Sequence, residues 1–137
     1  MGASQRLCKA AKPALLKGED ALVGVIARSD RVGWPDPMVQ ASRIPADTDV
    51  VLVVTSHRLL VLHHDGRDHV GEPWLGVGPH NLLELDVVQY NPLTATCVIR
   101  YLDGSVTELT TLTIKSIPGL RAAFRHLLPK LDDLPTT

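Results

Sequence analysis

Aromatic side chains are scarce in this sequence. Only 4% of the 137 residues are Phe, Trp or Tyr, and Phe124 is the single phenylalanine. Hydrophobic residues still make up 45% of the chain, which is ordinary for a folded protein and excludes an intrinsically disordered one. We therefore expect an aliphatic core built mostly of Val and Leu.

An excess of charge of either sign is also missing. Fourteen Lys and Arg residues stand against 15 Asp and Glu residues, so the net charge is −1 and the isoelectric point is about 6.6. Nucleic-acid-binding domains usually have a basic face and an isoelectric point above about 9. Membrane anchors of the polybasic type carry clusters of about four to eight cations. We therefore expect no nucleic-acid partner, and contact with membrane lipid is not the favoured function.

The sequence also has few cysteines and no long apolar run. Cys8 and Cys97 are too few for the dense disulfide framework of a small secreted domain, which favours a reducing compartment. No stretch approaches the roughly 20 apolar residues of a transmembrane helix, and no apolar run of signal-peptide length opens the sequence. The sequence therefore predicts a soluble cytoplasmic protein.

Length and pattern predict one domain over residues 1–137, with its core at about 15–131 and a frayed tail at 132–137. A short helix is expected over about 4–17, and Pro13 either kinks it or delays its start. An amphipathic helix is expected after Ser116, with apolar residues at helical spacing. About seven strands are expected between these helices, drawn from the runs 21–28, 38–43, 50–55, 59–63, 69–70, 81–90, 96–101 and 106–114.

The strand connections are too short for parallel crossovers, so the sequence predicts an antiparallel sheet in a mainly β member of the α+β class. Gly and Pro content predicts loops at 30–37 and 71–79. The last hairpin is expected to have a three-residue loop with Gly104 in the left-handed conformation. This register places five side chains on one inner face: Cys97, Ile99, Tyr101, Thr107 and Leu109.

Two motifs occur in a familiar order. Leu16-Lys-Gly-Glu19 precedes the first strand, and Val53-Val-Thr-Ser-His-Arg-Leu-Leu60 spans a central hairpin. Together with the hairpin at Tyr101-Leu-Asp-Gly104 and the terminal helix, they resemble bacterial pleckstrin-homology-like domains and the related GRAM domains. The resemblance covers residues 15–131. It implies a partly open, seven-stranded barrel with the C-terminal helix closing one end.

No arrangement of residues in the sequence indicates catalysis or metal binding. His63, His64 and His69 flank a predicted turn, but zinc usually needs about four convergent ligands, and adjacent strand residues point to opposite faces. Ser56 and His57 are neighbours in a turn, where we do not expect the two side chains to face each other as in a catalytic pair. We expect no enzyme, no metal and no cofactor.

The resemblance also implies a candidate ligand site. In pleckstrin-homology-like domains that bind phosphoinositides, the loops after the first and third strands meet at the open end of the barrel, where Arg side chains suit phosphate. Four aspartates crowd the same region and oppose an anion, and Trp34 could instead pack on its own prolines. The residues of this candidate site are Arg28, Arg31, Trp34, Arg43, His57 and Arg58.

Two central strands, 50–54 and 59–62, are apolar on both faces. Such strands expose an apolar patch unless something covers it, and the alanine-rich N-terminal helix is a weak cover. We call Val51, Val53, Leu60 and Leu62 the outer patch and predict that a second copy of the chain, or another protein, binds there. The first functional hypothesis is thus a non-catalytic module that binds a protein or forms a homodimer. The alternative is a binder of a lipid headgroup or another small anionic ligand, and an enzyme comes third.

Overall fold

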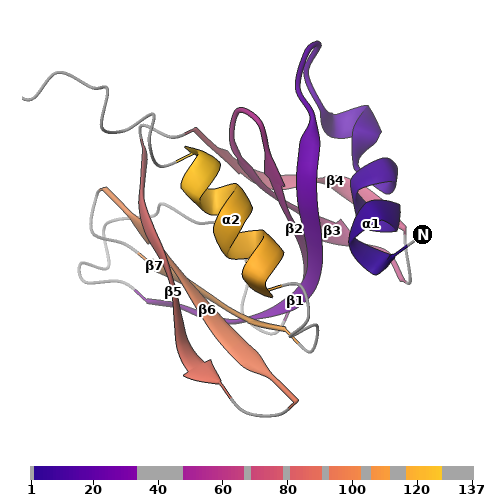
Figure 1. The fold of residues 1–137 in the computed structure, drawn as a ribbon. Helices are drawn as coiled ribbons and strands as arrows, with labels where there is room; N and C mark the ends of the chain where they lie inside the picture. Colours follow the sequence, from indigo (N-terminus) through magenta and orange to yellow (C-terminus); the bar gives the residue numbers. More distant parts are fainter. Residues whose placement is uncertain are drawn as a thin grey trace, which may run out of the picture.

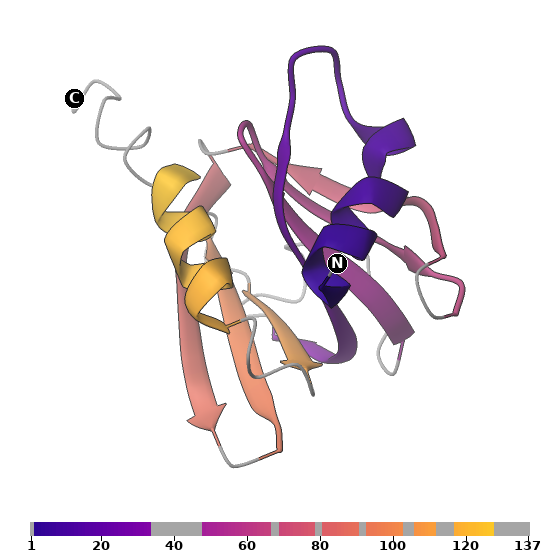
Figure 2. The same cartoon turned by 45° about the vertical axis from the view of Figure 1, so that its right-hand side comes forward.

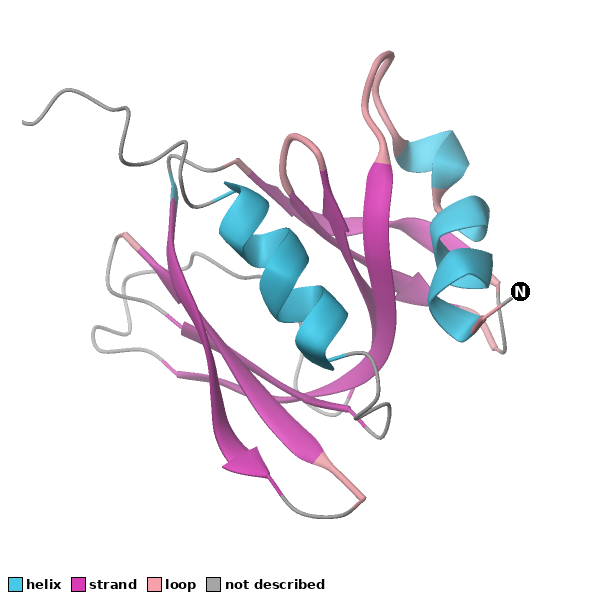
Figure 3. Cartoon of the chain, viewed as in Figure 1, coloured by secondary structure: helices cyan, strands magenta, loops and turns pink. Residues whose placement is uncertain are grey.

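The computed structural model describes residues 2–33, 48–66, 69–78, 81–90, 93–102, 106–111 and 117–127. These residues form two α-helices, a short 3-10 helix and one antiparallel sheet of seven strands (Figures 1 and 3). The helices are α1 (Ala3–Ala10), η1 (Lys12–Ala14) and α2 (Ile117–Leu127). The strands are β1 (Ala21–Gly33), β2 (Thr48–Thr55), β3 (Leu59–His64), β4 (Val70–Val77), β5 (Leu82–Tyr90), β6 (Ala95–Tyr101) and β7 (Val106–Thr111).

Strand β1 joins the two halves of the sheet, whose order is β4-β3-β2-β1-β7-β6-β5. Its first part pairs with β2, from Ala21 opposite Thr55 to Ser29 opposite Thr48, and its last residues pair with β7. The register shifts just after Ser29, whose buried hydroxyl accepts a hydrogen bond from the Thr48 N–H at 3.1 Å. A partly open, mainly β fold results, as the sequence predicted.

Each face of the central strands is covered by a different helix. Alternate residues of β1, β2 and β3 pack with β6, β7 and α2 in the larger core, where Phe124 is 2% exposed. The residues between them face the other way and pack against Leu7 of α1 and Ala11, which directly follows this helix. Figure 2 shows α1 beside β1 and well apart from α2. The strands are apolar on both faces because both faces are buried.

Helix α1 lies unusually close to the sheet at Gly24. A Cβ atom at this position would stand 2.9 Å from the Cβ of Leu7, so only glycine allows the contact. The Gly24 N–H also donates a hydrogen bond to the Ser4 hydroxyl at 3.0 Å. Helix α1 is therefore held on the sheet by its close contact with Gly24 and by the burial of its apolar side chains.

The structure corrects three local predictions. Residues 30–33, expected at the start of a loop over 30–37, are the last residues of β1, because they pair there with β7. The expected helix over 4–17 ends at Ala10, and Pro13 lies in η1, where a missing N–H is tolerated. The expected loop over 71–79 is largely β4, an edge strand with two register shifts against β3. Pro73 fits there because an edge strand leaves one row of N–H groups unpaired in any case. The predicted strand 38–43 and the tail 132–137 lie outside the described residues.

The predicted register of the last hairpin is confirmed. Cys97 pairs with Leu109 and Ile99 with Thr107, so the five predicted side chains share the inner face, and all five are buried. The Tyr101 and Thr107 hydroxyls lie 2.9 Å apart and satisfy each other in the core. Gly104 lies outside the described residues. Over the described part of the chain, no helix is long and apolar enough to cross a lipid bilayer.

Candidate binding site

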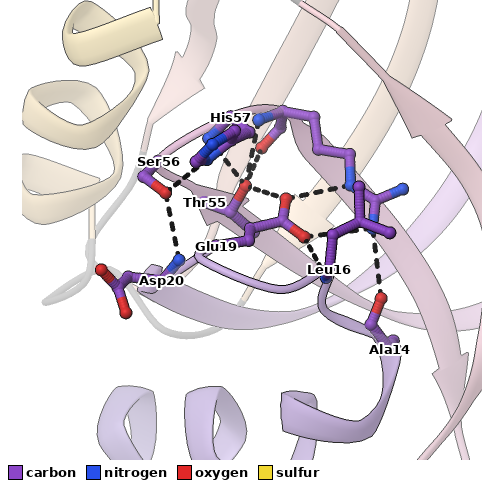
Figure 4. Close-up of polar contacts among 8 residues, drawn as sticks. Ala14, Leu16, Glu19, Asp20, Thr55, Ser56 and His57 are labelled. Carbon is purple, nitrogen blue, oxygen red and sulfur yellow. Dashed lines mark hydrogen bonds and ion pairs between the residues drawn. The ribbon is translucent and has the colours of Figure 1, made fainter.

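Glu19 is a buried carboxylate at the start of β1. Its side chain is 0% exposed and accepts two hydrogen bonds from Arg58, through Nε at 2.9 Å and a terminal nitrogen at 3.1 Å. The Thr55 hydroxyl donates at 2.6 Å and the Leu16 N–H at 2.9 Å (Figure 4). We call Glu19, Thr55 and Arg58 the Glu19 network. Every oxygen of this carboxylate is thus satisfied, as a buried charge requires.

The Glu19 network ties three segments together. Arg58 also donates to the Ala14 carbonyl at 3.1 Å, which holds η1. Thr55 Oγ1 accepts the N–H groups of His57 and Arg58, which closes the turn between β2 and β3. Burial raises the pKa of the Glu19 carboxyl, but the hydrogen bonds of Arg58, Thr55 and Leu16 and the charge of Arg58 outweigh it and lower the pKa to about 2. Glu19 is therefore ionised at neutral pH.

Because of this pairing, Arg58 has a structural role instead of the predicted ligand-binding one. Its side chain is 24% exposed, and two of its nitrogens bind Glu19 and Ala14. The two motifs that suggested a family, one before β1 and one in the β2–β3 hairpin, thus meet in one ion pair.

The turn between β2 and β3 also corrects the prediction for Ser56 and His57. Their side chains do face each other, with Ser56 Oγ 2.7 Å from His57 Nδ1. The same hydroxyl accepts the Asp20 N–H at 3.0 Å, so the bond fixes the turn against the loop before β1. Among the described residues, no three His, Cys, Asp or Glu side chains gather as a metal ion would require.

The predicted ligand site does not assemble from the described residues. Arg28 pairs with Asp49 near one end of the β1–β2 ladder. The turn at 56–58 follows Thr55, which pairs with Ala21 at the other end of this ladder. The sequence interpretation counted 38–43 as a strand, which made 56–58 the loop after a third strand; in the structure this turn joins β2 to β3. Arg31 pairs in register with Glu108 on β7. Trp34 and Arg43 lie outside the described residues.

The outer patch is not exposed. All four of its side chains are 0% exposed, and they lie against Leu7 of α1 and against Ala11, the residue after this helix. The prediction that these four side chains form a self-association surface is therefore wrong for this conformation. Helix α1 of the same chain covers the outer patch. Its apolar side chains are small, but they reach the patch because Gly24 lets the helix lie close to the sheet.

A groove of about 540 Å³ lies between α1, η1 and the loop that leads into β1. We call it the N-terminal groove. Lys9 of α1, Lys12 of η1 and Lys17 of the loop line it, together with apolar Leu15 and Leu16. All three lysines are exposed. Three cations from three consecutive segments thus converge on one concave surface.

Few acids oppose these lysines. Of the two lining carboxylates, Glu19 is paired with Arg58, and Asp20 is exposed. Residues 1–18 contain four of the chain's 14 cationic side chains and none of its 15 acidic ones. The sequence analysis missed this asymmetry because the total charge of the chain conceals it and the four cations are not contiguous.

Comparisons with known proteins inform the fold. No protein-family model and no curated protein sequence matches the chain. Among solved structures, the chain is similar to Vav1 bound to an allosteric inhibitor that blocks its GEF activity, at 11% identity and a TM-score of 0.53, over 94% of this chain and 22% of that one. It is also similar to the DH/PH domains of p115-RhoGEF, at 9% identity and a TM-score of 0.51, over 98% of this chain and 39% of that one.

The chain therefore spans less than half of either protein that it resembles. The likeness extends over nearly all of this chain, and the architecture agrees with it: an antiparallel, partly open sheet of seven strands closed by a C-terminal helix. The chain has a pleckstrin-homology-like fold.

Proposed function

We propose that the chain is a non-catalytic binding module that holds an anionic group of its partner in the N-terminal groove. The observation that carries this proposal is the convergence of Lys9, Lys12 and Lys17 on a groove whose buried acid, Glu19, is already neutralised by Arg58. A concave surface lined by charges of one sign concentrates ligands of the opposite sign.

The surrounding structure prepares the groove for binding. A hydrogen bond from Arg58 to the Ala14 carbonyl holds the chain between Lys12 and Lys17, and one from the Leu16 N–H to Glu19 spans Lys17. Gly18 adopts a positive φ of 80°, which turns the chain back toward β1. Binding therefore need not order the loop first, which preserves affinity.

The competing hypotheses have less structural support. Of the predicted ligand-site residues Arg28, Arg31, Trp34 and Arg43, the structure describes the side chain of Arg28 alone. Asp49, an acidic residue, pairs with Arg28 on the neighbouring strand. A protein partner and a homodimer both remain predictions, but they no longer rest on the outer patch. Light scattering at micromolar concentration tests the homodimer against the monomer mass of 14.9 kDa.

The proposal is tested with inositol hexakisphosphate, a soluble polyanion, titrated into ¹⁵N-labelled protein. The largest amide shifts should fall on residues 8–21, and affinity should fall as salt rises. Lys12→Ala/Lys17→Ala should weaken binding severalfold. Arg121→Ala/Arg125→Ala, an equal change of charge on the exposed face of α2, should not. Equal weakening by both pairs, or shifts spread over the whole surface, would refute a specific groove.

A further inference from the structure

Helix α1 is attached to the sheet by few contacts. Leu7 is the only residue of this fully described helix that is buried. Gly24 of β1 lies directly against the helix, and its N–H group donates to the Ser4 hydroxyl at 3.0 Å. A helix of eight residues is too short to be stable by itself, so α1 depends on these contacts. Elements with so few buried apolar contacts open at a lower free energy than the core of a protein does.

The segment that follows α1 is held separately. Arg58 donates to the Ala14 carbonyl at 3.1 Å, and Glu19 accepts the Leu16 N–H at 2.9 Å. Both bonds come from the Glu19 network, and neither involves α1. Strands β2 and β3, which lie beneath the helix, are each paired with a strand on both sides. Helix α1 can therefore leave the sheet while η1, the loop and the strands stay in place.

The N-terminal groove is lined from both of these parts. Lys9 belongs to α1, whereas Lys12 and Lys17 belong to the segment that the Glu19 network holds. The groove therefore has its observed lining only while α1 lies on the sheet. The outer patch is buried in the same conformation, because Leu7 packs against it. One docking event thus completes the groove and covers the patch.

We infer that α1 is a reversible cover of the outer patch and that an anion in the N-terminal groove holds this cover closed. The anion contacts Lys9 on one side and Lys12 or Lys17 on the other. It binds the closed conformation more tightly than an open one, in which Lys9 has moved away, and so shifts the population toward the closed form. The inference rests on the proposed function, because it describes the regulation of the same groove. An empty groove permits opening, which exposes the four apolar side chains of the outer patch.

The coupling between helix and groove acts in both directions. A substitution that loosens α1 must weaken anion binding, even at a residue that the anion does not touch. Leu7 and Gly24 are such residues, since neither is among the residues that line the groove. Their contact nevertheless fixes the helix, because a Cβ atom at Gly24 would stand 2.9 Å from the Leu7 Cβ. A site on a rigid surface would not respond to a change at either residue.

The first test is amide hydrogen exchange of the full chain, followed by NMR with and without inositol hexakisphosphate. Without it, amides of α1 should exchange faster than those of β2 and β3. The Gly24 amide is a further reporter, because its hydrogen bond to Ser4 breaks when the helix leaves. Inositol hexakisphosphate at about 100 times its dissociation constant should slow exchange in α1 by up to about a hundredfold. Exchange in α1 as slow as in β2 and β3 without the anion would overturn the inference, because α1 would then open only when the whole domain unfolds.

The second test uses substitutions outside the groove. Leu7→Ala and Gly24→Ala should each weaken binding of inositol hexakisphosphate severalfold, because the closed fraction of the protein falls. Gly78→Ala is the matched control and should leave the affinity unchanged, since no atom lies within 4 Å of the added Cβ. Thermal melts check that the variants fold. The exchange measurement needs no variant, so it decides the matter even if both substitutions unfold the chain.

The outcomes separate this inference from the proposed function. Amide shifts that place inositol hexakisphosphate in the groove, without slower exchange in α1, would overturn the cover and leave the proposed function standing. Unchanged affinity in both variants, if they are folded, would overturn the coupling in the same way. Failure of inositol hexakisphosphate to bind in the groove would overturn both.

Discussion

Replacing Glu19 by Gln tests the Glu19 network directly, because the substitution removes the charge and keeps the shape. The Glu19 pKa falls from its ordinary value of 4.5 to about 2 in the folded chain, and this difference corresponds to about 3 kcal/mol of stability at neutral pH. The carboxylate is fully buried, so solvent screens the interaction little. We expect Glu19→Gln to lower the free energy of unfolding by about 3 kcal/mol at pH 7, which is within the range for breaking a buried ion pair.

The effect has a defined dependence on pH. A carboxyl whose pKa is lower in the folded state contributes stability above its unfolded pKa and loses that contribution as pH falls through the folded pKa. The difference between the native chain and Glu19→Gln should therefore shrink between pH 4.5 and pH 2. It should be about 2 kcal/mol near pH 3.5 and below about 1 kcal/mol near pH 2.5.

Urea titrations followed by circular dichroism, repeated across this pH range, provide the measurement. Glu84→Gln is the control, because Glu84 also pairs with Arg100 at 3.0 Å, but both side chains are well exposed. An exposed pair contributes at most about 1 kcal/mol, so the control should change stability little. The reasoning fails if Glu19→Gln is as mild as the control at pH 7. It also fails if the loss of stability is the same at pH 7 and pH 2.5.

Three further predictions concern the two helices. Phe124→Ala should lower the free energy of unfolding by about 3–5 kcal/mol in chemical denaturation, since Phe124 of α2 is only 2% exposed; a loss below about 1 kcal/mol would contradict its role in closing the sheet. Gly24→Ala should push α1 off the sheet, because the new Cβ would stand 2.9 Å from the Leu7 Cβ, and amide hydrogen exchange in α1 should accelerate; Gly78→Ala, with no atom within 4 Å, should not do this. Deletion of residues 2–11 should uncover the outer patch and cause self-association in light scattering; a truncated chain that stays monomeric and folded would refute the covering role of α1.

Local patterns in the sequence predicted most of the fold. The alternation along 97–109 specified the register of the last hairpin, and the apolar spacing from Ile117 to Leu127 specified α2. Strand β4 was missed because Gly71, Pro73 and Gly76 normally mark loops. They are tolerated here because β4 is an edge strand, and the position of a strand within a sheet is a tertiary property.

The candidate site was less predictable. Glu19 and Arg58 each stood in a recognised motif, but nothing in the sequence pairs two residues that lie 39 positions apart. Arg58 therefore looked like a free cation. The sequence suggested that helix α1 covers the outer patch weakly, because the apolar stripe of the helix is mostly alanine. The close contact that holds α1 on the sheet depends on Gly24, which belongs to β1. Lys9, Lys12 and Lys17 converge only because η1 and the loop after it reverse the chain.

The double pairing of β1 also fixes the order in which the sheet can form. Its first part pairs with β2 across a short stretch of chain, but its end must find β7, where Arg28 meets Thr110 about 80 residues later. The entropy lost on closing a loop grows with loop length, so we expect the β1–β7 ladder to form after the pairing of β1 with β2. On the ribosome, β1 to β4 can pair while the end of β1 waits as an open edge. The β1 edge is covered only when β7 has been synthesised, and until then it is exposed to pairing with other chains.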